Sequence, residues 1–318
     1  MIIVTGGAGF IGSNLVRGLN ARGERDLLVV DNLSDGTKYR NLVGCELLDY
    51  MDKEELLPAL ESGAIAGSNI RAVFHQGACS VTTEWDGRYM MRNNYDYSKR
   101  LYRFCQTYRI PFIYASSGAV YGTGTEFAER VENEAPLNVY GYSKQLFDQY
   151  VRRYAGSSAS QVAGLRYFNV YGPRESHKGG MASVIFHFNN QLQSGDRIKL
   201  FAGSDGYADG EQRRDFIHVD DIVAVNLWLL DHPEHSGIFN VGTGVARSFN
   251  DVARAVLSAY GRGEIEYIPF PDKLVGRYQS FTEADMSGLR AIGYEAEFIP
   301  IERGVPAYLD WLRQPNAF

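Results

Sequence analysis

The sequence predicts an α/β protein, in which a doubly wound parallel sheet carries a smaller, interleaved C-terminal lobe. Three features of its 318 residues indicate this fold. The apolar segment 2–4 runs into a glycine-rich turn and a helix that begins near Phe10, as in the first unit of a parallel sheet. Strand and helix patterns then alternate through the first half. From about Asn169 onward Gly, Pro and aromatic residues interrupt the alternation, so we expect a first domain over 1–170 and a lobe over 171–318, with a soft boundary.

The periodicity of apolar residues assigns the elements of these two parts. In the first domain, short apolar runs predict strands and longer amphipathic runs predict helices that cover both faces of the sheet. The expected strands are 2–4, 27–31, 72–75, 112–116 and 162–167, and the expected helices are 53–61, 89–108 and 140–154. In the lobe we expect helices over 182–193, 221–230, 249–260 and 301–312, and a strand over 215–218. No repeat, low-complexity tract or linker separates the parts, so we expect them to interleave.

Composition disfavours several classes of partner. The net charge of −6 and the pI near 5.6 argue against general affinity for nucleic acid or anionic membranes, because both are negatively charged. A small-molecule partner is favoured. The three cysteines lack a C-x-x-C spacing and the six histidines are scattered, which is typical of a reducing compartment and of a protein without a metal site. Met1 leads directly into the first strand and no apolar run reaches membrane-spanning length, so we expect a cytoplasmic protein.

The segment 5–12 reads Thr-Gly-Gly-Ala-Gly-Phe-Ile-Gly and predicts a phosphate-binding turn of the Rossmann type. We expect Gly6 to permit the tight turn, Gly9 to let backbone N–H groups approach a pyrophosphate, and Gly12 to let the helix pack on the strand. The dipole of the following helix favours the same anion. Glycine-rich turns also occur in hairpins and helix caps, but here a strand precedes the turn and a helix follows it. The sequence therefore predicts a dinucleotide cofactor.

The residues alone leave the form of this cofactor open. Asp31 ends the second predicted strand, where an acidic side chain normally binds the ribose hydroxyls, and this favours NAD. Lys38, Arg40 and Lys53 follow it, and cations near this point would favour the 2′-phosphate of NADP. Basic residues in a loop are, however, more often solvated surface charges.

A second turn is expected beside the cofactor, after the predicted strand 72–75. Its residues are Gln76, Gly77, Ala78, Cys79 and Ser80. The turn lies at the carboxyl edge of the sheet, and its small residues allow close approach. An ordinary turn from a strand into a loop would have a similar composition.

Tyr140 and Lys144 form a Tyr-x-x-x-Lys pair on a predicted helix, where they are one turn apart on one face. Such a pair also arises by chance in a chain with 21 tyrosines. A free tyrosine has a pKa of about 10. We expect Lys144, together with a positively charged nicotinamide ring, to lower that pKa so that Tyr140 acts as a general base for an alcohol. Lys144 would also bind the nicotinamide ribose. Ser116, at the end of the strand 112–116, is expected to hydrogen-bond the reacting oxygen, with Ser117 facing the other way.

These motifs resemble those of the extended short-chain dehydrogenase/reductase superfamily, the group of nucleotide-sugar epimerases and dehydratases. The resemblance rests first on the segments 5–12, 116–122 and 140–144. Further stretches resemble one branch, the enzymes that invert C6 of an ADP-linked heptose. They are 83–87 with 93–95, 166–175 with 177–179, and 270–274 with 276–279. The likeness covers essentially the whole chain. The motifs around Lys178 and Tyr278 are specific, whereas the others are shared by many activities.

The resemblance implies an epimerase that converts ADP-D-glycero-D-manno-heptose to its L-glycero epimer, a precursor of the lipopolysaccharide core. It implies one tightly bound NADP in each subunit, a 6-keto intermediate and no net redox change. Acid/base help on the two faces of that intermediate would come from Tyr140 and Lys178. It also implies a homo-oligomer, which in the family is a pentamer.

The same resemblance implies further binding residues. At the cofactor it adds Phe10, Ile11, Asn32, Asn93, Val170 and Lys178 to those already named. For the substrate it implies Ser116, Asn169, Gly180, His187, Phe201, Ala202, Gly203, Ser204, Arg214 and Tyr278. An arginine suits a diphosphate because its guanidinium pairs with two oxygens. Gly118, Val120 and Gly180 depart from the family pattern, and the segment 205–212 looks long and acidic, so fine substrate contacts can differ.

Three alternatives remain open at this point. An NAD-dependent 4-epimerase of a UDP-hexose would share the superfamily motifs, and cofactor preference and the segment around Lys178 distinguish it. A 4,6-dehydratase needs an acid/base carboxylate pair where this chain has Gly118 and Ala119. A protein that only senses dinucleotide would not need the reactive residues Tyr140, Lys144 and Ser116.

Overall fold

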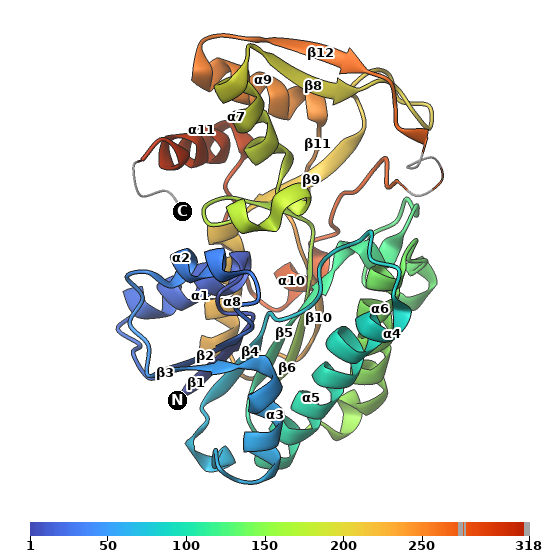
Figure 1. The fold of residues 1–318 in the computed structure, drawn as a ribbon. Helices are drawn as coiled ribbons and strands as arrows, with labels where there is room; N and C mark the ends of the chain where they lie inside the picture. Colours follow the sequence, from blue (N-terminus) through green and yellow to red (C-terminus); the bar gives the residue numbers. More distant parts are fainter. Residues whose placement is uncertain (273–275, 277, 315–318) are drawn as a thin grey trace.

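The computed structural model describes residues 1–272, 276 and 278–314 of the chain. Its largest layer is a seven-stranded parallel sheet in the order β10-β6-β5-β4-β1-β2-β3 (Figure 1). The strands are β1 (Ile2–Thr5), β2 (Leu27–Asp31), β3 (Asp49–Asp52), β4 (Ala72–His75), β5 (Phe112–Ser117), β6 (Val162–Tyr167) and β10 (Gly237–Val241). This topology confirms the doubly wound α/β fold expected from the sequence.

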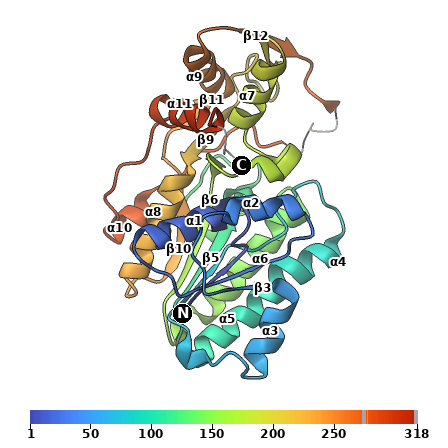
Figure 2. The same ribbon diagram turned by 60° about the vertical axis from the view of Figure 1, so that its left-hand side comes forward.

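Helices cover both faces of this sheet (Figures 1 and 2). One face carries α1 (Phe10–Ala21), α8 (Val219–Asp231) and α10 (Ser287–Ala291), and the other carries α3 (Lys53–Glu61), α5 (Tyr97–Tyr108) and α6 (Val139–Tyr154). Successive residues of a strand serve opposite faces. In β1, Ile2 and Val4 pack in the core under α1 and α8, whereas Ile3 packs in the core under α3 and α5. Burial on both faces explains why the central strands are almost continuous apolar runs.

The smaller lobe lies beyond the carboxyl edge of the large sheet (Figure 1). It contains β7 (Asn169–Tyr171), β9 (Arg213–His218) and β11 (Ala246–Ser248) in one sheet, β8 (Arg197–Phe201) and β12 (Glu264–Ile268) in another, and helices α7 (Val184–Ser194), α9 (Phe249–Tyr260) and α11 (Ile301–Leu312). Between these elements the chain returns to the large layer to form α8 and β10. The two parts of the chain therefore interleave, and a division at residue 170 stays a prediction.

Some elements differ from those expected. The predicted helix 89–108 is divided: α4 (Gly87–Met90) is followed by a π-helical turn over Met91–Asp96, and only then does α5 begin. The strands β3 and β10 of the large sheet were not predicted, and neither were β7, β8, β11 and β12 of the lobe. The sequence of β3 is Asp-Tyr-Met-Asp at the edge of the sheet, which gives little apolar signal, and β10 pairs with β6 from a distant part of the chain. The helix α2 (Tyr39–Leu42) was also not predicted, since it is a single short turn.

Two properties of the described residues bear on function. No helix among them is long and apolar enough to cross a membrane. They also contain no group of three or more His, Cys, Asp or Glu side chains that could hold a metal ion.

A cluster of buried charges joins α6 to β5 and β6. Arg166 and Asp148 are both fully buried. Arg166 Nε donates to Asp148 Oδ2 at 3.0 Å, and the same guanidinium binds Glu134. The Asp148 carboxylate also accepts hydrogen bonds from the hydroxyls of Tyr114 and Ser116, each at 2.9 Å. Because burying charges is costly unless each one is paired and hydrogen-bonded, these residues depend on one another.

Arg166→Met tests this dependence, because it removes the guanidinium that pairs with the buried Asp148 and leaves Glu134 with Arg152 as its remaining cation. We expect it to lower the free energy of unfolding by about 3–5 kcal/mol in urea denaturation. Arg100 is the matched control: it binds both carboxylate oxygens of Glu61 at 2.7 Å, with 48% of its side chain exposed. Arg100→Met should cost less than about 1 kcal/mol. Equal losses in the two variants would contradict the argument.

Candidate active site

A cleft of about 660 Å³ lies along the carboxyl ends of the parallel strands, the edge where open α/β sheets bind ligands. The ends of β1, β2, β4, β5 and β6 line it on one side. Lys178 and Met181, from the loop after β7, and Gln279 and Thr282, from the C-terminal part, also line it. The cleft is therefore shared between the two parts of the chain.

The glycine turn at one end of the cleft has the shape that a pyrophosphate requires. Gly6 has a φ of +66°, and a Cβ on it would lie 2.6 Å from the backbone nitrogen of Gly77. A Cβ on Gly12 would lie 2.1 Å from the carbonyl oxygen of Gly6. Both positions therefore require glycine. Helix α1 begins at Phe10 with Gly9 as an N-cap that provides no side-chain hydrogen bond, so the first N–H groups of the helix remain for an anion.

The side chains that follow β2 form a charged group beside this turn. Asp31 accepts a hydrogen bond from the backbone N–H of Asn32 at 2.7 Å and pairs with Lys38 at 2.5 Å. Lys38 also donates to the side-chain oxygen of Asn32 at 3.2 Å. Lys53 donates to Asn93 Oδ1 at 2.7 Å. The Asp31 carboxylate is thus neutralised by a lysine that itself lines the cleft.

The cleft gathers all the residues that the sequence predicted at a cofactor. They are Gly6, Gly9, Phe10, Ile11, Gly12, Asp31, Asn32, Lys38, Lys53, Gln76, Gly77, Ala78, Cys79, Ser80, Asn93, Lys144, Val170 and Lys178. Two predicted substrate residues, Ser116 and Asn169, also line it. Arg40, considered as a third cation near the cofactor, borders a second cavity of about 240 Å³ beside α7 and α11.

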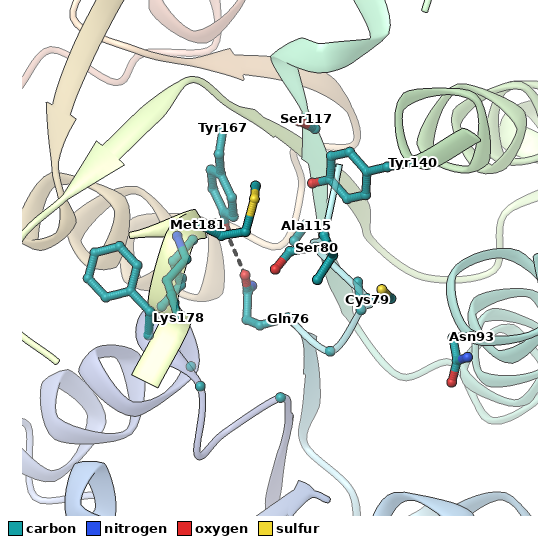
Figure 3. Close-up of a pocket in the computed structure, with 18 of the residues that line it drawn as sticks. Gln76, Cys79, Ser80, Asn93, Ala115, Ser117, Tyr140, Tyr167, Lys178 and Met181 are labelled. Atoms are coloured by element: carbon teal, nitrogen blue, oxygen red, sulfur yellow. Dashed lines mark hydrogen bonds between the residues drawn. The ribbon is translucent and has the colours of Figure 1, made fainter. Parts of the chain in front are cut away.

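Tyr140 reaches the cleft from the first turn of α6, which Asn138 caps. Burial raises the pKa of Tyr140, and a hydrogen bond with Ser117, which lies beside it in Figure 3, opposes part of this rise. We expected Lys144 to lower the pKa of Tyr140. In the structure Lys144 donates instead from Nζ to the carbonyl oxygen of Ala115 at 2.7 Å, and burial lowers the pKa of Lys144 itself to about 8. The protein's own groups therefore favour a neutral phenol.

The serine that faces Tyr140 is Ser117 and not Ser116, which corrects our expectation. Ser116 borders the cleft, but its hydroxyl donates to Asp148 Oδ2 and is buried against α6. Tyr114 binds the same carboxylate, so these two residues of β5 share one face. Because successive strand residues alternate in direction, Ser117 points the other way. The sequence predicts that Ser116 and Ser117 point in opposite directions, but it does not predict which of the two faces α6.

Lys178 enters the cleft from the loop 172–183. Its Nζ lies 5.1 Å from the centre of the Phe10 ring. Burial lowers the pKa of the Lys178 amine, and the charge of Glu175 opposes this. Figure 3 shows Tyr140 and Lys178 approaching from opposite sides, one from α6 and the other from the loop. A carbon held between them would have a proton donor or acceptor on each side.

The other predicted substrate residues lie in the smaller lobe and the loop before it, beyond the described lining of the cleft. They are Gly180, His187, Phe201, Ala202, Gly203, Ser204, Arg214 and Tyr278. The buried guanidinium of Arg214 lies 4.6 Å from the centre of the Tyr278 ring. Gln212 donates to two oxygens of the segment 201–204, both at 3.1 Å. Residues 273, 274 and 277 of the predicted motif around Tyr278 lie outside the described residues.

Several residues of the cleft were not predicted. Tyr167 donates to Gln76 Oε1 at 3.1 Å (Figure 3), and Thr82 donates to the sulfur of Met181 at 3.9 Å. Each pair joins residues about a hundred positions apart. No local pattern in the sequence indicates such contacts, because the first depends on the order of strands in the large sheet and the second on how the two parts of the chain meet.

Known proteins are similar to this chain in sequence and in fold. The model of the NAD dependent epimerase/dehydratase family matches residues 2–242. The ADP-L-glycero-D-manno-heptose-6-epimerase of Alkalilimnicola ehrlichii is 63% identical over 310 residues, which cover 98% of this chain and 97% of that protein.

Solved structures give the same result. The ADP-L-glycero-D-manno-heptose-6-epimerase of Helicobacter pylori has a TM-score of 0.85 at 30% identity, over 97% of this chain and 94% of that one. The UDP-glucose 4-epimerase of Thermus thermophilus, solved in complex with NAD, has a TM-score of 0.80 at 30% identity, over 99% of both chains. The chain therefore belongs to the NAD dependent epimerase/dehydratase family, and its cofactor is a nicotinamide dinucleotide.

Proposed function

We propose that this protein inverts C6 of ADP-D-glycero-D-manno-heptose, giving the L-glycero epimer through a 6-keto intermediate. The observation that carries the proposal is the approach of Tyr140 and Lys178 to one cleft from opposite sides (Figure 3). Inversion by oxidation and reduction needs a proton acceptor on one face of the carbon and a proton donor on the other. The 63% identity to the Alkalilimnicola ehrlichii enzyme supports the choice of substrate.

The cofactor we propose is NADP, one in each subunit, held throughout turnover. A bound nicotinamide ring supplies the hydride acceptor and donor that this chemistry needs. The first turn of α1 would hold the pyrophosphate, and Lys144 would hold the nicotinamide ribose. Lys38 supports NADP over NAD because it already neutralises Asp31, whose carboxylate would otherwise repel a 2′-phosphate. A second cation, Lys53, lines the same cleft.

The chain's own residues would move the proton. Ser117 lies beside the Tyr140 phenol, so it would hold the oxygen on C6 there while the alcohol proton passes to Tyr140. Once the sugar presents its other face, Lys178 would give a proton to the same oxygen. In the reverse direction the roles of Tyr140 and Lys178 exchange. Over a full turnover Tyr140 and Lys178 together neither gain nor lose a proton, and the sugar is neither oxidised nor reduced.

The remaining features implied by the resemblance are also proposals. They are a cofactor domain over 1–170, a substrate lobe over 171–318, a cytoplasmic location, a homo-oligomer and a place in the synthesis of lipopolysaccharide precursors. The pairing of Arg214 with Tyr278 supports a site for the diphosphate in the lobe, since a guanidinium binds two phosphate oxygens at once.

Turnover without added cofactor tests the proposed function. Purified protein should interconvert the two ADP-heptose epimers, and native mass spectrometry should detect one NADP per subunit, because the cofactor stays bound between turnovers. Two results would contradict the proposal: bound NAD together with 4-epimerisation of a UDP-hexose, or stripped protein that prefers NAD over NADP by about twentyfold, about 1.8 kcal/mol.

The two proposed acid/base residues are tested by substitution. Tyr140→Phe and Lys178→Met should each lower kcat by about 10²–10⁴-fold, because each removes one proton transfer. The matched controls are Tyr142→Phe and Lys199→Met, which should keep normal rates. Tyr142 lies two residues after Tyr140 and is 46% exposed, and Lys199 is exposed on β8. Initial rates are measured in both directions at confirmed NADP content. A variant with near-normal turnover would remove its residue from the mechanism.

The two serines at the end of β5 provide a second comparison. Ser117→Ala removes the hydroxyl beside Tyr140 and should lower kcat by roughly 10²-fold. Ser116→Ala removes a donor from the buried carboxylate of Asp148 and should lower the free energy of unfolding by about 1–3 kcal/mol, with a much smaller effect on kcat. Kinetics and urea denaturation of both variants measure this. A larger loss of kcat in Ser116→Ala would restore Ser116 to the reacting group.

A further inference from the structure

One buried carboxylate closes the loop that carries Lys178. This loop runs from Gly172, after β7, to Ser183, the N-cap of α7. Glu175 is fully buried. Its Oε1 accepts a hydrogen bond from the Ser183 hydroxyl at 2.6 Å and a longer one from the backbone N–H of Gly172 at 3.4 Å, and its Oε2 accepts from the backbone N–H of Ser183 at 2.6 Å. A single side chain therefore ties the two ends of the loop together.

Glu175 and Lys178 also act on each other's charge. Burial raises the pKa of Glu175, and the Lys178 charge is the largest influence that opposes this. Burial lowers the pKa of Lys178, and the Glu175 charge opposes that in turn. Because both carboxylate oxygens accept hydrogen bonds from N–H or O–H donors, the carboxyl group needs no proton of its own.

The other groups that face this pair do not replace the carboxylate. From α1, the neighbour of the Lys178 amine is the Phe10 ring. His177, on the same loop, has its pKa lowered by burial and by the charges of Lys38 and Lys178, so it is neutral near neutral pH. From α11, Tyr308 has its pKa raised by burial and by Glu175, so it too is neutral there.

We propose that Glu175 is the positioning residue for Lys178: its buried carboxylate fixes the loop 172–183 and keeps the Lys178 amine available as an ammonium ion. This inference rests on the proposed role of Lys178 in proton transfer. An epimerase that works in both directions needs a proton to have similar free energies on its two acid/base groups. Burial of Tyr140 and Lys178 favours the neutral form of both. Glu175 and Lys178 lie one turn apart, because the backbone N–H of Lys178 donates to the carbonyl oxygen of Glu175 at 2.9 Å. A fixed negative charge there favours the state in which Tyr140 is a phenolate and Lys178 an ammonium ion, and so reduces the difference in proton free energy.

The test measures the ionisation of Lys178 in the intact protein. Trace acetylation with acetic anhydride over a series of pH values labels only the neutral amine, and peptide mass spectrometry gives the titration midpoint of Lys178. Glu175→Gln removes the charge and keeps the size. We expect its Lys178 midpoint to move to lower pH, with labelling at neutral pH increased on the order of tenfold, while exposed Lys199 keeps its midpoint. A loop that merely opened would expose the amine to water and move the midpoint to higher pH, because burial is what lowers the pKa of Lys178.

Two further variants separate charge from anchoring. Ser183→Ala removes the hydroxyl that binds Glu175 but leaves both charges, so the Lys178 midpoint should match the wild type. Glu175→Asp keeps the charge and shortens the side chain, so its midpoint should also stay close to the wild type; this variant remains informative if Glu175→Gln does not fold. An unchanged midpoint in Glu175→Gln overturns the proposal, and so does a tenfold increase in labelling with a lowered midpoint in Ser183→Ala or Glu175→Asp.

Activity is measured in parallel and judged separately. In Glu175→Gln one limb of the pH profile of kcat/KM should move to lower pH, because the ammonium form of Lys178 is lost earlier as pH rises. If Lys178→Met turned over normally, the proposed role of Lys178 would fail, yet the labelling midpoint would still decide whether Glu175 controls its ionisation.

Discussion

The attachment of α6 to the carboxyl end of β5 is the contact on which the geometry of the cleft depends. The hydroxyls of Tyr114 and Ser116 both donate to Asp148 of the helix. Between them, the carbonyl oxygen of Ala115 accepts from Lys144, one helical turn earlier. These bonds fix the height of the helix along the strand and its rotation about its own axis. The tyrosine at the start of α6 and the last serine of β5 are thereby brought together, and Arg166 beneath them makes the arrangement costly to disturb.

Burial explains the electrostatics of the cleft and the need for buried partners. A low-dielectric site penalises the charged form of every group in it, which raises the pKa of Tyr140 and lowers those of Lys144 and Lys178. Each lysine has one carboxylate that opposes this effect: Asp148 for Lys144 and Glu175 for Lys178. Both carboxylates also hold backbone segments in place through hydrogen bonds. Charge balance and backbone position are therefore set by the same side chains.

Local patterns predicted what depends on local physics. The turn 5–12 needs glycine at Gly6 and Gly12, because a Cβ there would overlap backbone atoms. The glycines in the sequence therefore predict the turn directly. The Tyr140–Lys144 spacing likewise follows from helix geometry. The orientation of Ser117 depends on which face of β5 receives α6, and the place of Lys178 depends on how a distant loop meets α1. These are tertiary choices, so a resemblance to known sequences was needed for Lys178 and the structure was needed for Ser117.

The junction between that loop and α1 joins the two halves of the proposed chemistry. The Lys178 amine lies over the Phe10 ring at the first residue of α1, and His177 lies 3.1 Å from Asn41, whose amide also donates to the backbone carbonyl of Ala8 in the glycine turn at 2.9 Å. The turn proposed to hold the pyrophosphate and the loop that carries the second acid/base group therefore share their supports. An enzyme that removes hydrogen from a carbon and then returns it to the same carbon must keep the cofactor site and the acid/base residues at fixed positions while the sugar turns between them. Interleaving of the two parts, with α8 and β10 built from the later sequence, connects the lobe to the large sheet at several points of the chain.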